Sequence, residues 1–120
     1  MKVLLADDDP LIMETLETVF KANGFEVIKC SNGLTAMETA RVHNPDLIII
    51  DIMMPKLNGW EVCNSLKQDE TFRRTPLVIL TAKTAQSDEF KGLECGADLY
   101  LKKPFNPLEV FQQARKLLGK

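Results

Sequence analysis

The feature that most constrains the fold is a regular alternation of short apolar runs and amphipathic segments along the whole chain. The runs are continuous and rich in β-branched residues, which is typical of strands buried on both faces of a parallel sheet. We expect strands at residues 2–6, 25–29, 46–50, 76–80 and 98–101. The alternation predicts one α/β domain over residues 1–120, built from five βα units with helices on both faces of the sheet.

Helix start signals separate the apolar runs. Asp9 before Pro10 is typical of an N-cap followed by the first helical residue, and Asn106-Pro107 repeats this signal before Glu109. The first helix should end at Asn23-Gly24. The other helices are expected at about 33–43, from residue 59 onward, and at 84–95. The last helix is expected to bury Leu108, Phe111, Ala114 and Leu118.

Composition argues against several classes of protein. The formal net charge of -2 gives no electrostatic case for direct binding of nucleic acid or an anionic membrane. No apolar run approaches the ~18 residues of a membrane span. Cys30, Cys63 and Cys95 form no CxxC motif, so we interpret them as small buried residues of a reducing, cytoplasmic compartment. The only histidine, His43, is assigned no role.

Polar residues follow four of the five predicted strands at their carboxyl ends. These residues are Asp7 and Asp8, Asp51, Thr81 and Lys103. Each alone has an ordinary explanation, such as a helix cap, a surface ion pair or a strand residue. Ligands of open parallel sheets bind at the carboxyl ends of the strands, so the group as a whole predicts a functional site there.

The three aspartates of this group, Asp7, Asp8 and Asp51, predict a bound metal ion. Like charges at ~4 Å and an effective dielectric of ~20 cost about 4 kcal/mol for each pair, a cost that a cation would relieve. All the candidate ligands are oxygens, which favours a hard cation, and Mg²⁺ is the default. The three aspartates and Lys103 leave two net negative charges, which one divalent ion neutralises.

The remaining chemistry fits phosphoryl transfer. A carboxylate at the mouth of the sheet, such as Asp51, can act as a nucleophile and form an aspartyl phosphate. The hydroxyl of Thr81 can donate to a phosphoryl oxygen, and Lys103 can supply positive charge to the transferring group.

The sequence resembles the receiver domain of two-component response regulators, of the chemotaxis-regulator type. The resemblance covers essentially the whole chain and is carried by Leu4 to Asp8, Asp46 to Pro55 with Gly59, Leu80-Thr81-Ala82 and Lys103-Pro104-Phe105. It implies a flavodoxin-like, doubly wound (βα)5 fold with strand order 2-1-3-4-5. It also implies a self-catalysed phosphoacceptor, which takes and later loses a phosphoryl group, and not a turnover enzyme.

The resemblance also assigns residue roles. Asp51 would accept the phosphoryl group from a phosphohistidine on a sensor histidine kinase. Asp8, Asp51 and the backbone carbonyl of Met53 would bind Mg²⁺, with Asp7 acting through water. Thr81 and Lys103 would contact the phosphoryl oxygens, and the Lys103-Pro104 bond is expected to be cis.

A switch is implied as well. Phosphorylation should draw Thr81 toward the new oxygens, and Tyr100, on the last strand, should then turn inward. The output face, and the surface for any phosphorylation-dependent dimer, would comprise the helix at 84–95, the strand at 98–101 and the last helix.

Other functions are weaker interpretations. An aspartyl-phosphate phosphatase needs a general acid where Met53 stands, and Met53 cannot transfer a proton. A flavodoxin-like cofactor binder would need a first loop that attracts phosphate, whereas Asp7-Asp8-Asp9 repels it. Two alternatives stay open for the receiver: a stand-alone regulator or phosphorelay intermediate, or one domain of a longer transcription factor or enzyme. Met1 at the start of the first strand favours a natural N-terminus.

Overall fold

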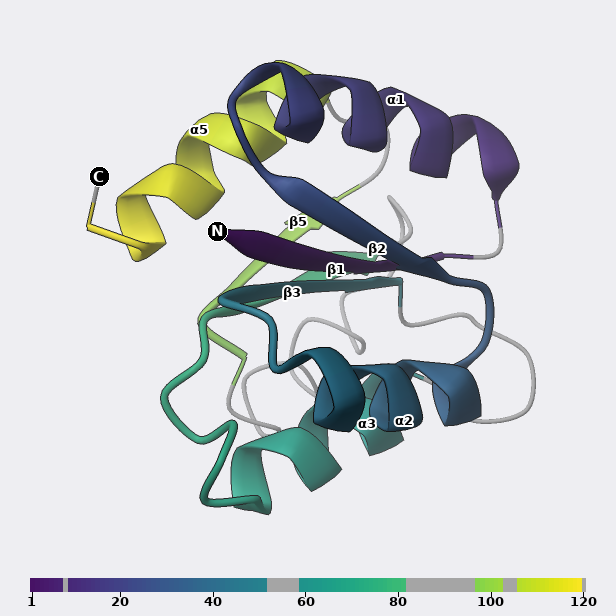
Figure 1. Ribbon diagram of the computed structural model, residues 1–120, viewed down its shortest axis with the longest axis vertical. Coiled ribbons are helices and arrows are strands. Elements are labelled where there is room, and N and C mark those ends of the chain that lie inside the picture. Colours follow the sequence, from purple (N-terminus) through teal and green to yellow (C-terminus); the bar gives the residue numbers. More distant parts are fainter. Residues whose placement is uncertain (8, 52–58, 82–96, 103–105, 120) are drawn as a thin grey trace.

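The computed structural model describes residues 1–7, 9–51, 59–81, 97–102 and 106–119 (Figure 1). Its centre is a five-stranded parallel sheet in the order β2-β1-β3-β4-β5, as expected. The strands are β1 (Lys2–Ala6), β2 (Glu26–Cys30), β3 (Leu47–Asp51), β4 (Leu77–Thr81) and β5 (Leu99–Lys102). Within the described residues, no helix is both long and apolar enough to cross a lipid bilayer.

Four of the strands begin one residue later than the sequence predicts. The residues before two of these strands still join the sheet through the backbone: Asp46 N donates to Lys2 O at 2.9 Å, and Asp98 N donates to Leu77 O at 2.9 Å. The apolar runs therefore mark the strands correctly but not their exact ends. The shift makes Asp51 and Thr81 the last residues of β3 and β4, where we had expected them just after the strands.

The helices lie in two layers, one on each face of the sheet (Figure 1). They are α1 (Pro10–Ala22), α2 (Gly33–His43), α3 (Gly59–Gln68) and α5 (Pro107–Leu117). Helices α1 and α5 cover one face, and α2 and α3 cover the other. The helix predicted at 84–95 lies outside the described residues.

Strand alternation divides the core into two halves. The half under α2 and α3 includes Leu4, Ala6, Ile48, Ile50, Leu77 and Ile79. The half under α1 and α5 includes Val3, Leu5, Leu47, Ile49, Val78 and Leu80. All twelve side chains are at most 1% exposed, so both faces of the three central strands are buried, as their uninterrupted apolar sequences predict.

Three phenylalanines join α1, the residue before β2 and α5 on one side of the sheet. The ring of Phe20 makes edge-to-face contacts with Phe25 and Phe111, with centroids 5.2 Å apart in each pair. Phe25 and Phe111 also meet edge to face, at 6.0 Å. Each ring therefore contacts the other two in the geometry that aromatic pairs prefer.

The prediction for the buried face of α5 was partly wrong. Phe111 and Ala114 are buried as expected, but Leu108 is 51% exposed and Val110 is fully buried in its place. Leu118 is only partly buried and lies at the C-cap. Leu108 and Val110 both fit a helical stripe that includes Phe111. The orientation in which α5 packs against α1 buries Val110 and leaves Leu108 exposed.

Polar caps begin three of the helices. Asp9 Oδ1 accepts from Leu11 N at 3.0 Å, and Asn106 Oδ1 accepts from Leu108 N at 2.9 Å, which confirms both predicted N-caps. The structure adds a cap at Asn32, whose Oδ1 accepts from Thr35 N at 2.9 Å. Helix α1 ends at Asn23 as predicted, and Gly24 follows with a φ of 87°, a conformation that favours glycine.

We expect Asp9→Ala to lower the free energy of unfolding by about 1 kcal/mol, because it removes the acceptor for an otherwise unpaired amide of α1. Urea titration followed by circular dichroism measures this loss. Asp9→Asn keeps an Oδ1 acceptor and should match the wild type. An equal loss in both variants would contradict a capping role for Asp9.

Candidate functional site

Strand register brings the carboxyl ends of β1, β3, β4 and β5, where the predicted site residues stand in the sequence, to one edge of the sheet. Ala6 pairs with Ile50 across β1 and β3, so Asp7 follows at the level of Asp51. Along the same edge, Thr81 pairs with Lys102 across β4 and β5. The carboxyl ends of four strands therefore meet there, as the sequence predicts.

The carboxylates of Asp7 and Asp51 are both buried at this edge, at 2% and 4% exposure. They are the only charged side chains buried to this degree among the residues whose burial is described. Asp51 lies two residues after Ile49 in β3 and therefore shares its face, the one covered by α1. Asp7 lines a pocket with residues of α1. Two buried carboxylates on adjacent strands form the core of a candidate cation site.

The segment after β1 is fixed by a chain of local hydrogen bonds. Asp7 N donates to Cys30 O at 3.2 Å and so extends the pairing of β1 with β2. Asp7 Oδ1 accepts from Asp9 N at 2.9 Å, while the side chain of Asp9 caps α1. Asp9 is thus explained by local structure as the N-cap of α1, and a role for Asp7 in the site stays a prediction.

A pocket of about 700 Å³ opens beside Asp7, between α1 and β2. Glu17 and Lys29 lie on its wall and form an ion pair at 3.0 Å, and Glu17 also pairs with Lys21 at 2.9 Å. The hydrogen bonds from Lys21 and then Lys29 lower the pKa of Glu17 below its ordinary value. Glu17 therefore keeps its negative charge at a lower pH than an ordinary glutamate does. Its ion pairs stabilise the fold above its ordinary pKa, and that contribution is lost when the pH falls through the lowered pKa.

Cys30 also lines this pocket but is only 6% exposed. Its thiol lies 3.7 Å from Leu5 O, and burial raises its pKa to about 11 from an ordinary value of 9.0. The prediction of a small buried cysteine is thus confirmed at this position. The side chain of Cys63 and the whole of Cys95 lie outside the described part of the structure.

We expect Cys30 to resist alkylation by iodoacetamide at pH 8 in the native protein and to react in urea, because the thiolate is the reactive form. Peptide mass spectrometry reports this cysteine separately from the others. The raised pKa means that its contribution to stability is complete below pH 9.0 and is lost as the pH rises toward about 11. Equal labelling in buffer and in urea would contradict its burial.

Of the other predicted site residues, some lie outside the described part of the structure and some are described only in their backbone. Asp8, Met53 and Lys103, with the Lys103-Pro104 bond, lie outside the described residues. Thr81 and Tyr100 have their backbones placed in β4 and β5. Within the described residues, no group of three or more His, Cys, Asp or Glu side chains could hold a metal. Two of the three expected aspartates, Asp7 and Asp51, are among those residues.

Comparison with known proteins identifies the family. Residues 3–115 match the family described as the response regulator receiver domain. This chain belongs to that family. The receiver domain is 41% identical over 117 residues to the alkaline phosphatase synthesis transcriptional regulatory protein PhoP of Bacillus subtilis. The matched region covers 98% of this chain and 48% of PhoP. The receiver domain thus spans about half the length of the curated relatives it matches.

Solved structures support the same fold. The receiver domain of the Francisella response regulator 1452 superimposes with a TM-score of 0.89 at 35% identity and covers 98% of this chain and 96% of that one. The receiver domain of sensor histidine kinase PA1611 from Pseudomonas aeruginosa has a TM-score of 0.89 at 28% identity, with 99% and 98% covered. That structure has a magnesium ion coordinated in its active site cleft. The flavodoxin-like receiver fold predicted from the sequence is confirmed.

Proposed function

We propose that this receiver domain accepts a phosphoryl group on Asp51 from a phosphohistidine of a sensor histidine kinase, in a reaction that requires Mg²⁺. The observation that carries the proposal is the burial of Asp7 and Asp51 at the carboxyl edge of two adjacent parallel strands. Carboxylates gathered at the carboxyl ends of neighbouring parallel strands suit a site that a cation and a nucleophile must share.

In the proposed reaction, a carboxylate oxygen of Asp51 forms a bond to phosphorus. The bond from phosphorus to the histidine nitrogen breaks, and its electron pair stays on the imidazole. The hydroxyl of Thr81 and the ammonium of Lys103 orient the transferred group and balance its charge. Water later hydrolyses the acyl phosphate and restores Asp51, so the domain is a regulated phosphoacceptor and not a turnover enzyme.

The donor set fits Mg²⁺. Asp8, Asp51 and the carbonyl of Met53 would hold the ion, with Asp7 acting through water, and all of these donors are oxygens. When bound, Mg²⁺ supplies the positive charge that lets the phosphoryl group approach three aspartates. The magnesium ion in the PA1611 receiver supports this assignment.

For the output, we favour control of transcription by a longer cytoplasmic protein, because PhoP is named as a transcriptional regulatory protein. The net charge of -2 offers no basic surface for nucleic acid on this domain itself, so DNA contact would belong to another domain. A stand-alone relay protein remains the alternative. The presence or absence of an output domain in the gene product separates the two.

The proposed switch couples Thr81 to Tyr100 and to the face made by residues 84–95, β5 and α5. The backbones of both residues lie on neighbouring strands, with Tyr100 paired to Ile79 in β4. Tyr100→Ala should leave phosphoryl uptake intact but remove the change in partner binding, or in dimerisation, that phosphorylation causes. Analytical ultracentrifugation of both proteins, with and without phosphodonor, measures this. An unchanged response in the variant would exclude the aromatic from the switch.

The test of the phosphoacceptor function is intact-mass spectrometry after incubation with a small-molecule phosphodonor such as acetyl phosphate. We expect a gain of one phosphoryl group in Mg²⁺ and none in a chelator. Readdition of Mg²⁺ should restore the gain. Uptake that is independent of Mg²⁺, or no uptake under any condition, would contradict the proposal.

A further inference from the structure

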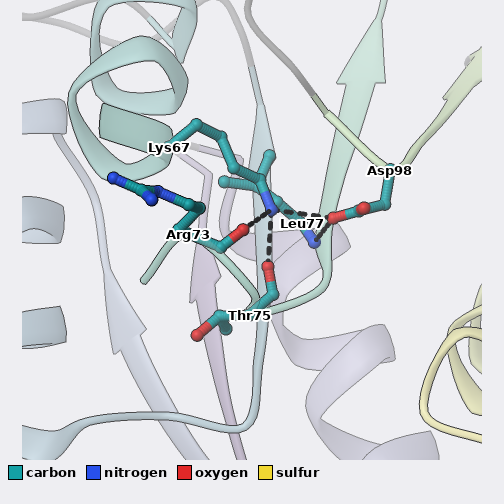
Figure 2. Close-up of polar contacts among 5 residues, drawn as sticks. All are labelled: Lys67, Arg73, Thr75, Leu77 and Asp98. Carbon is teal, nitrogen blue, oxygen red and sulfur yellow. Dashed lines mark hydrogen bonds and ion pairs between the residues drawn. The ribbon is translucent and has the colours of Figure 1, made fainter. Parts of the chain in front are cut away.

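A polar network at the amino edge of the sheet joins the end of α3 to the starts of β4 and β5 (Figure 2). Lys67 Nζ donates to Thr75 O at 2.8 Å and to Arg73 O at 3.4 Å, and forms an ion pair with Asp98 Oδ2 at 2.9 Å. The side chain of Lys67 is only 12% exposed. Its three N–H donors thus meet three acceptors in a largely buried position, which stabilises a charge that would be costly if unpaired.

Asp98 connects this network to the strand pair. Its Oδ2 also accepts from Leu77 N at 2.8 Å, and its own N–H donates to Leu77 O at 2.9 Å. The residue before β5 is therefore bonded twice to the first residue of β4. Lys67 holds the same carboxylate oxygen from the side of α3.

The register of β5 depends on such contacts because the strand is short and lies at the edge of the sheet. It has four residues, and within the described sheet it is bonded only to β4. Leu99 and Leu101 pack against the core under α1 and α5. Since side chains alternate with a period of two, a slip of two residues would leave leucine on the same face. One of the two leucine positions would then hold Ala97 or Lys103, so the apolar pattern opposes the slip at one position only, and the paired Asp98 opposes it further.

We propose that Lys67 and Asp98 are positioning residues for phosphoryl transfer, because they hold β5 in the register that pairs Thr81 with Lys102. Lys103 is the next residue in the sequence, so this register fixes the strand end from which the chain continues to Lys103. A two-residue slip would move that strand end by about 6.6 Å. A displacement of only ~1 Å can cost about 100-fold in rate. This inference rests on the proposed function.

The test compares variants of the network in phosphoryl uptake and in Mg²⁺ binding. Lys67→Met and Asp98→Ala should slow uptake from acetyl phosphate at least about tenfold at saturating Mg²⁺. Their dissociation constants for Mg²⁺ alone, measured by calorimetry, should stay within about twofold of wild type, because the metal site is built on β1 and β3. Amide exchange should accelerate across Leu99–Lys102 but not in β1.

Two further variants separate positioning from general loss of stability. Asp98→Asn keeps an acceptor oxygen for Leu77 N–H and should recover uptake to within about threefold of wild type. Lys21→Met removes an ammonium from an ion pair of equal length, 2.9 Å, whose lysine is 59% exposed, and should change neither readout. All rates are compared at a temperature where circular dichroism finds each variant folded.

Wild-type uptake in folded Asp98→Ala and Lys67→Met would overturn the positioning role. A parallel loss of Mg²⁺ affinity would also overturn it, since the effect would then be general. If the wild type itself takes up no phosphoryl group, the proposed function fails. The exchange rates in β5 still report whether the network holds the register.

Discussion

Asp51→Ala is expected to abolish phosphoryl uptake, by more than about a thousandfold, because it removes the nucleophile itself. The measurement is intact-mass spectrometry over a time course with acetyl phosphate and Mg²⁺. The substitution also removes one of two buried carboxylates, so Mg²⁺ should raise the thermal midpoint of the variant less than that of the wild type.

A matched control lies at the other end of the same strand. Asp46 precedes β3, is exposed, and accepts from Lys2 N at 2.8 Å. Asp46→Ala should therefore take up a phosphoryl group at the wild-type rate. Uptake that persists in Asp51→Ala would refute the assignment of the nucleophile, and equal loss in both variants would point to a general defect of β3.

Phe20→Ala should have the largest effect on stability, a loss of about 3–5 kcal/mol. The side chain of Phe20 is fully buried and contacts Phe25 and Phe111, so truncation leaves a cavity where α1, β2 and α5 meet. A loss of this size is a large part of the roughly 5–15 kcal/mol typical of a domain. Urea unfolding monitored by circular dichroism gives the value.

The control for this cavity is Val42→Ala on α2. Val42 is 78% exposed, so its truncation should change the free energy of unfolding by no more than about 0.5 kcal/mol. If Phe20→Ala cost less than about 1 kcal/mol, the aromatic cluster would not be the centre of this half of the core.

Much of the fold follows from local sequence patterns. Continuous β-branched runs predict strands buried on both faces, and Asp9-Pro10 and Asn106-Pro107 mark helix starts that the structure confirms. Strand ends were less predictable because polar residues such as Asp98 continue the backbone pairing before the apolar run begins. The buried face of α5 was misassigned because Leu108 and Val110 both fit a helical stripe, and only packing against α1 distinguishes them.

The candidate site was predictable for a different reason. In a parallel sheet all carboxyl ends lie at one edge, so Asp7 and Asp51 could be expected at the same edge without knowledge of side-chain packing. The Lys67–Asp98 pair gave no such signal. Its members are 31 residues apart and lie at the amino edge, where no motif marks them, and only the three-dimensional packing of α3 against the β4–β5 pair brings them together.

The most direct test of the account is the location of the phosphoryl group. Borohydride reduces an aspartyl phosphate to homoserine, so peptide mass spectrometry of the phosphorylated, reduced protein identifies the modified residue. We predict conversion at Asp51 alone, and only in samples that contained Mg²⁺. Conversion at another aspartate, or a phosphoryl group that survives reduction on a hydroxyl or imidazole, would contradict the central claim that Asp51 is the phosphoacceptor.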